Sequence, residues 1–186
     1  LKQIGITDHG FSHLAFGLKR NKVPSLKRDC MEASKALEID VLVGMEANIR
    51  GESGLSDLTE ADYDDFDLFI CGKHVLIAYE TFGDWWHYFG GNFTVDKFGR
   101  KPPESLIKRN TRAYINMIKR NPVDIVSHLC YLCPADAAEV AKCAADYGTY
   151  IELNSKKVHL TDEELYKVVE TGVRFVIDSD AHSVDR

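Results

Sequence analysis

The chain has 186 residues, of which 45% are hydrophobic and 28% are charged, which suits one folded domain and excludes extended disorder. Its formal net charge of -6 argues against a surface that coats nucleic acid, although metals bound in an acidic pocket can still attract phosphate. Nothing approaches the roughly 20 apolar residues of a membrane span, and the five cysteines do not form a disulfide framework, so we expect a reduced, cytoplasmic setting without membrane contact.

Short apolar runs of strand length alternate along the chain with longer runs of helical period. The runs predict strands at residues 3–7, 40–45, 67–71, 123–126, 149–153 and 173–177. Helices are expected at about 25–37, with Ser25 as the N-cap, and at 103–119, 135–147 and 161–171. Gly148 should end the third helix, and Thr161 and Glu164 have capping-box spacing at the start of the fourth.

The predicted strands are apolar enough to be buried on both faces, as in a parallel sheet covered by helices. Six such strands indicate an α/β barrel or an open doubly wound sheet. The aromatic and glycine-rich segment 79–100 interrupts the alternation. We expect it to be a long loop, which either forms a lid or substrate wall or simply packs on the body.

Chemically useful side chains follow nearly every predicted strand. In chain order they are Asp8 and His9, Glu46, His74, His128, Asn154 and Lys156, and Asp180 and His182. The carboxyl ends of parallel strands meet on one face of a sheet or barrel, where α/β enzymes place their sites. The sequence therefore predicts that four histidines and several carboxylates converge on one site.

Imidazoles and carboxylates without a thiolate suit Zn²⁺ or Mn²⁺, and also Fe²⁺. The potential ligands outnumber what one tetrahedral ion can use, so two or three divalent metals are expected. Such a site fits phosphoester hydrolysis, because a metal supplies hydroxide at neutral pH and neutralises charge on the phosphate. The sequence shows no serine or cysteine nucleophile with a convincing base.

The motifs GITDHG, GMEANI, GKH, IVSH, IELNS and SDAH occur in the order found in the PHP (polymerase and histidinol phosphatase) family and cover nearly the whole chain. The pattern resembles most closely the small stand-alone bacterial phosphatases of that family. The resemblance implies a distorted (βα)₇ TIM-like barrel with a trinuclear centre. The chain would then be a single PHP domain over residues 1–186, truncated at both ends, without the first strand and the C-terminal end of the barrel.

The resemblance also implies a ligand set centred on Glu46. That carboxylate would bridge two metals and would complete one metal position with His74 and His128. His9 and His182 would serve a second position. Asp180 would join Glu46 at a third.

Asp8 would orient a ligand rather than bind a metal itself. The family opens with a His-x-His strand and a further histidine, which this sequence does not show before Leu1, and His13 is not a substitute. Only the position built on Glu46, His74 and His128 is therefore complete. Either the missing strand belongs to a longer protein, which we favour, or the site is degenerate.

We expect a phosphatase that acts on a small phosphorylated molecule, with Asn154 and Lys156 either contacting the substrate phosphate or serving as ordinary loop residues. A PHP-type exonuclease is an alternative that the acidic charge disfavours. A non-catalytic metal-binding module is another. Cys130 and Cys133 form a C-x-x-C pair that we interpret as core thiols, since no second pair supports a zinc site. The sequence does not indicate the substrate or the oligomeric state.

Overall fold

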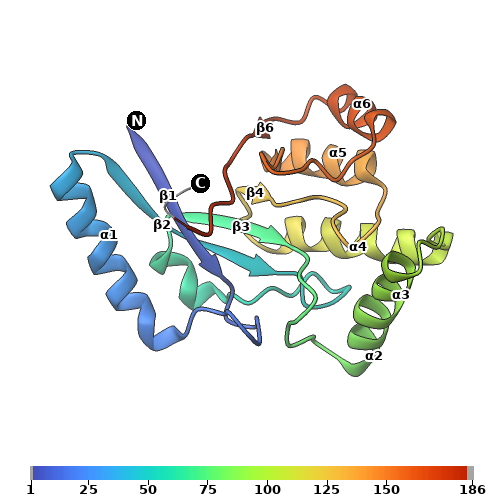
Figure 1. Ribbon diagram of the computed structural model, residues 1–186, viewed down its shortest axis with the longest axis horizontal. Coiled ribbons are helices and arrows are strands. Elements are labelled where there is room, and N and C mark those ends of the chain that lie inside the picture. The colour runs from blue at the N-terminus through green and yellow to red at the C-terminus, as the bar shows by residue number, and fades with distance from the viewer. Residues whose placement is uncertain (1, 184–186) are drawn as a thin grey trace.

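The computed structural model describes residues 2–183, which form a six-stranded parallel sheet with helices packed against it (Figure 1). The strands are β1 (Gln3–His9), β2 (Asp40–Asn48), β3 (Leu68–Gly72), β4 (Ile125–Val126), β5 (Tyr150–Glu152) and β6 (Phe175–Val176). The α/β class predicted from the sequence is therefore confirmed, and all six predicted strands exist, with β4, β5 and β6 shorter than expected.

The strands lie side by side in chain order, from β1 to β6, and every neighbouring pair is parallel. A doubly wound sheet reverses its strand order at a switch point, whereas a barrel adds strands in one direction. The sheet also curves. The rings of His9, at the end of β1, and of His182, beyond β6, lie 6.3 Å apart. Within residues 2–183 no hydrogen-bonded pair joins β1 to β6, so the described sheet is curved but not closed.

Four longer helices alternate with the strands, as predicted. They are α1 (Val23–Leu37), α4 (Glu104–Arg120), α5 (Ala137–Tyr147) and α6 (Asp162–Glu170). Two short 3₁₀ segments, η1 (Arg20–Lys22) and η2 (Glu60–Asp65), were not predicted. Gly148 ends α5 with φ of 75°, and the capping box of Thr161 and Glu164 starts α6, as expected.

Ser25 is not the N-cap of α1, contrary to the prediction. The helix begins two residues earlier, at Val23, with proline in its first turn. The Ser25 hydroxyl donates instead to the carbonyl of Lys22, 2.8 Å away.

The prediction of a long loop at residues 79–100 was wrong, because much of this segment is helical. It contains α2 (Phe82–Asp84), the π-helical turn η3 (Trp85–Gly91) and α3 (Asn92–Lys97). Phe82, Trp85, Phe89 and Phe93 recur at three- and four-residue spacing and stack in sequence, with ring centroids 5.4, 5.6 and 5.5 Å apart. This ladder of rings stabilises helical turns despite the glycines at 90 and 91.

The expectation that every strand is buried on both faces was also wrong for β1. Ile4 and Ile6 are each 40% exposed, because β1 lies at one edge of the described sheet. Val126 and Ile151, on the more central strands, are fully buried as predicted.

The core lies between the sheet and the helices, where Met45, Tyr114, Val140 and Ile151 are fully buried. Successive side chains of a strand point to opposite faces. Because Met45 and Ala47 enter this core, Glu46 between them must project to the other face of the sheet, where the candidate site lies.

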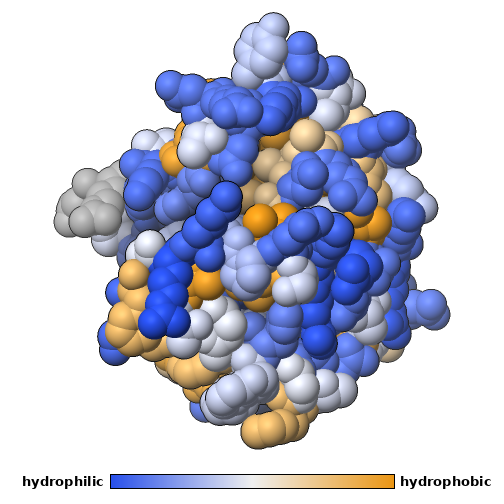
Figure 2. All heavy atoms as spheres, turned by 90° about the vertical axis from the view of Figure 1, so that its right-hand side faces the viewer, coloured by the Kyte–Doolittle hydropathy of each residue, from blue (hydrophilic) through white to orange (hydrophobic). Residues whose placement is uncertain are grey.

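The face shown in Figure 2 carries mostly hydrophilic residues, interrupted by small, separate hydrophobic patches. Phe16, Phe82 and Trp86 are among the large apolar side chains that remain exposed. Among the described residues, no helix has the length and hydrophobicity that crossing a membrane requires.

Candidate metal centre

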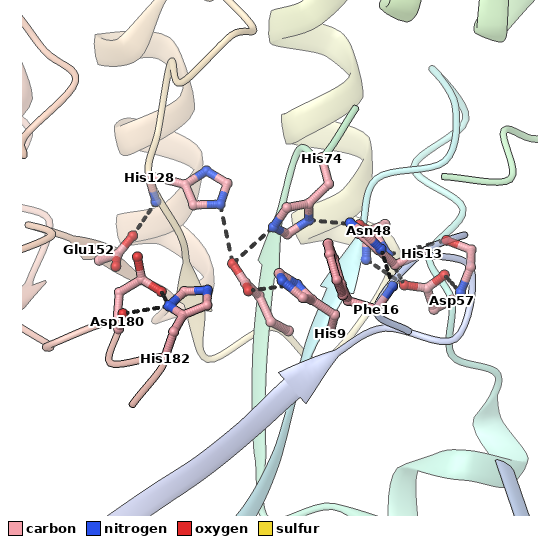
Figure 3. A network of polar contacts seen from close by, with 12 residues as sticks. His9, His13, Phe16, Asn48, Asp57, His74, His128, Glu152, Asp180 and His182 are labelled. Atoms are coloured by element: carbon pink, nitrogen blue, oxygen red, sulfur yellow. Dashed lines mark hydrogen bonds and ion pairs between the residues drawn. The ribbon is translucent and has the colours of Figure 1, made fainter. Parts of the chain in front are cut away.

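Glu46 is the hub of the site, because its carboxylate contacts three imidazoles, those of His9, His74 and His128, which are labelled in Figure 3. Its Oε1 lies 3.4 Å from Nε2 of His74 and 3.2 Å from Nε2 of His128. Its Oε2 lies 3.3 Å from Nδ1 of His9. These residues come from the ends of β1 and β2 and from the turns after β3 and β4, so the predicted convergence of strand ends is what the structure shows.

The charges of this cluster favour a cation. Burial alone would raise the pKa of Glu46, but its contacts with three imidazoles hold that pKa well below the usual range. The same carboxylate raises the pKa of His9, and it raises the pKa of His128 against the opposing effect of burial. Burial lowers the pKa of His74 and so favours its neutral form. An ionised carboxylate is thus ringed by nitrogen atoms that can become ligands once they lose a proton.

Asn48 sets the protonation of His74. Its Oδ1 lies 2.7 Å from Nδ1 of His74, and a carbonyl oxygen can only accept, so Nδ1 carries the hydrogen. Nε2, the atom that faces Glu46, therefore keeps its lone pair in the neutral ring. A histidine that binds metal through one nitrogen and donates through the other is the usual arrangement at such sites. The donor set thus fits a metal, and His9, Glu46 and His74 each offer one ligand atom within 4.8 Å of the others.

Asp180 and His182 form a second group beside the first. Nδ1 of His182 lies 3.5 Å from Oδ1 of Asp180. Lys156 reaches the same carboxylate, with Nζ 2.9 Å from Oδ2, and lies 3.3 Å from Nδ1 of His182. The Asn154 amide donates to Asp180 over 3.3 Å. The predicted substrate-binding residues therefore lie at the site, where each contacts a predicted ligand.

Glu152 and Asp178 were not predicted as site residues, yet they lie beside the cluster. Glu152 is buried and accepts hydrogen bonds from the backbone N–H of His128 and from the Asn154 amide. Burial and its hydrogen bond with Glu152 raise the pKa of Asp178 to about 7. The signal for Glu152 was present in the IELNS motif, where Glu152 ends β5 two residues before Asn154.

His13 also belongs to the cluster, although no sequence motif indicated a role for it. Its ring stacks on His9 with centroids 4.7 Å apart and meets His74 edge-on at 5.8 Å. The backbone N–H of Phe16 donates to its Nδ1 over 3.0 Å, so in the neutral ring Nε2 carries the hydrogen.

Asp8 lies on the outer face of β1, because it alternates with His9 along the strand. It is exposed, and within residues 2–183 its side chain makes no hydrogen bond to a predicted ligand. The structure therefore does not bring Asp8 to the ligands it was expected to orient.

Cys130 and Cys133 are core thiols, as interpreted from the sequence. Cys133 is buried, and Cys130 donates to the carbonyl of Ala135 over 3.7 Å. Burial raises the pKa of each thiol to about 12, which disfavours the thiolate form that zinc binds.

Similar sequences belong to bacterial proteins named probable phosphatases. One from Caldanaerobacter subterraneus and one from a Thermoanaerobacter species are each 29% identical to this chain over 98% of its length. The chain spans 65% and 67% of these two relatives, about two thirds of their length. No family model matches the sequence.

Solved structures with a similar fold include two described as histidinol phosphatases. The putative enzyme from Listeria monocytogenes matches with a TM-score of 0.58 at 12% identity, covering 99% of this chain and 85% of that one. The enzyme from Lactococcus lactis, solved with zinc, L-histidinol and phosphate, matches with a TM-score of 0.58 at 13% identity, covering 98% and 75%. The homologous sequences confirm the predicted relationship to bacterial phosphatases, and the solved structures show that the fold resembles that of histidinol phosphatases.

Proposed function

We propose that this chain carries the metal centre of a phosphatase that hydrolyses a small phosphorylated molecule. The observation that carries the proposal is the Glu46 carboxylate with imidazole nitrogens of His9, His74 and His128 at 3.2–3.4 Å. The names of its sequence relatives, probable phosphatases, point to the same reaction class.

Two or three divalent metals would be held by these residues. Glu46 would bridge, with His74 and His128 completing one position, His9 and His182 serving a second, and Asp180 joining Glu46 at a third. Oxygen and nitrogen donors without thiolate suit Zn²⁺ or Mn²⁺, and also Fe²⁺. Zinc in the Lactococcus lactis enzyme of similar fold supports the first choice.

When bound, the metals would supply positive charge for the phosphate and acidify water enough to provide a nucleophile at neutral pH. The chain's own residues would orient the metal ligands and bind the substrate phosphate. Asn48 holds His74 with Nε2 toward Glu46. Lys156, whose ammonium lies beside Asp180, would contact a phosphate oxygen, and so would Asn154, which contacts the same carboxylate.

Three further features belong to the proposal. The chain-order parallel sheet supports a distorted (βα)₇ barrel that the described residues form in part. The substrate would be small, as are the histidinol and phosphate in the Lactococcus lactis structure. Five free cysteines agree with reducing, cytoplasmic surroundings.

A two-part measurement tests the proposal. Purified protein is analysed for bound metals, then assayed with added Mn²⁺ or Zn²⁺ on sugar phosphates, amino-alcohol phosphates and short oligonucleotides. We expect bound transition metal and phosphate release from at least one small substrate. Absence of metal would refute the metal centre, and cleavage of oligonucleotides alone would favour the exonuclease alternative.

A further inference from the structure

Asp57, in the segment between β2 and η2, is a buried carboxylate that no motif pointed to. It is 6% exposed and accepts three N–H groups. Its Oδ2 accepts the backbone N–H and the side-chain amide of Asn48, both over 2.7 Å, and its Oδ1 accepts the backbone N–H of Ser12 over 2.8 Å. This carboxylate therefore ties the end of β2 to the segment that follows β1.

These hydrogen bonds fix which way the Asn48 amide faces. An ionised carboxylate has no hydrogen to donate, so the atom of Asn48 that meets Asp57 must be the NH₂ group. That group also approaches the Ser12 hydroxyl at 3.2 Å. The amide oxygen is left to face Nδ1 of His74, as Figure 3 shows.

If the Asn48 amide were rotated by 180°, the hydrogen of the neutral His74 ring would change position. The Asn48 NH₂ group would then donate to Nδ1 of His74, and the ring hydrogen would move to Nε2, the atom that faces Glu46. A protonated Nε2 has no lone pair for a metal. The orientation of one buried amide thus decides whether His74 can be a ligand.

We propose that Asp57 is a positioning residue of the metal centre, acting through Asn48 to hold His74 with a free Nε2 lone pair. The inference rests on the proposed function, since it gives His74 the role of a ligand. It adds two residues, Asp57 and Asn48, outside the ligand set implied by the motifs.

Gly10 leaves room for the contact between the Asp57 carboxylate and the Asn48 amide. A side-chain carbon at Gly10 would overlap the Asp57 carboxylate and would lie 3.0 Å from Nδ2 of Asn48. The glycine that follows His9 therefore leaves the space in which carboxylate and amide meet.

The first test measures the tautomer of His74 directly. Nitrogen-15 NMR of the metal-free chain, at a pH where His74 is neutral, should show the hydrogen on Nδ1. Hydrogen on Nε2 in the wild-type protein would overturn the inference without any variant. This readout needs no bound metal, so it separates failure of the inference from failure of the proposed function.

The second test is Asp57→Asn, measured as Zn²⁺ affinity by competition with a chelator on the full chain. We expect binding to weaken by ~10–100-fold, the usual effect of losing a group that orients a ligand. Asp62→Asn is the matched control, since Asp62 is also 6% exposed but pairs with Arg20 and caps η2. Equal losses in both variants, or none in Asp57→Asn while the wild type binds Zn²⁺, would overturn the inference.

Discussion

Nε2 of His128 lies 3.2 Å from Oε1 of Glu46, although the first residue follows β4 and the second lies in β2, two residues before its end. The same oxygen lies 3.4 Å from His74, and the other carboxylate oxygen lies 3.3 Å from His9. One carboxylate thus links the ends of four strands. It gives the cluster its only negative charge at these contacts, because the other three groups are imidazoles.

We expect Glu46→Gln to lose bound metal and to lower phosphatase activity by more than ~100-fold. The amide keeps the shape but loses the charge, and losing groups that merely orient ligands already costs ~10–100-fold. Elemental analysis and initial rates measure both effects. Glu139→Gln, on the exposed surface of α5, is the control. Activity within a few-fold of wild type would show that Glu46 does not bridge metals.

Lys156→Ala should raise KM by ~10-fold or more and change kcat less. The Lys156 ammonium lies 2.9 Å from Asp180 of the candidate metal centre. A charge-assisted hydrogen bond from this ammonium to phosphate would contribute ~1.5–3 kcal/mol to binding. Steady-state kinetics on the best substrate of the phosphate panel give both constants. Lys157→Ala removes an exposed neighbouring charge and should leave KM unchanged. Equal KM values in the two variants would show that Lys156 does not bind the substrate.

The sequence predicted the strands and the edge of the sheet at which the site lies because both depend on local patterns. Each strand is a short apolar run, and the residue after each run falls at the same edge of a parallel sheet. That rule placed Glu46, His74 and His128 on one face of the sheet, and the family resemblance grouped them at one metal position. The structure joins them within 3.4 Å.

The remaining parts of the site depend on contacts between segments distant in sequence, which no local pattern reveals. Asp57 reaches Ser12 and Asn48 across a turn, and His13 stacks on His9 because its segment pairs with residue Ile77. The helices at residues 82–97 were missed for a similar reason. Their glycines favour a loop, and only the stacking of side chains outweighs that preference.

Gly10→Ala should weaken Zn²⁺ binding although position 10 offers no ligand. The added methyl group would overlap the Asp57 carboxylate, so Asp57 or the chain after His9 must move. The Zn²⁺ dissociation constant, measured by chelator competition, should rise by ~10-fold or more. Gly83→Ala is the control, because a methyl group there meets only Thr81, at an ordinary 3.6 Å. Equal affinities in both variants would show that the contact at Gly10 is not needed.

Lys73 is a buried cation next to His74 in sequence, and its environment predicts how stability depends on pH. It is 3% exposed, and its Nζ donates to the carbonyl of Ile49 over 2.9 Å. The same atom lies 4.2 and 4.3 Å from the ring centroids of Tyr79 and Tyr88, whose faces attract a cation. Burial nevertheless lowers the pKa of Lys73 to about 7, from 10.5.

Between pH 7 and 10.5 the unfolded chain therefore holds a proton on Lys73 that the folded chain lacks. Stability must rise with pH across that window, since the state that binds more protons is favoured at lower pH. From pH 7 to pH 9 this group should add roughly 2 kcal/mol to the free energy of unfolding. Lys73→Met has no such proton, so the variant should lose this rise.

Urea unfolding of the metal-free protein gives the free energy of unfolding of wild type and variant at pH 7 and at pH 9. Taking the difference between the two proteins at each pH cancels the contribution of the other titrating groups. We expect the free energy of unfolding of Lys73→Met, relative to that of the wild type, to be lower at pH 9 than at pH 7 by roughly 2 kcal/mol. Lys108→Met, on the exposed face of α4, should show the same gap at both values. A gap for Lys73→Met that also stays constant would mean that Lys73 keeps its proton through pH 9, held by the two tyrosine rings.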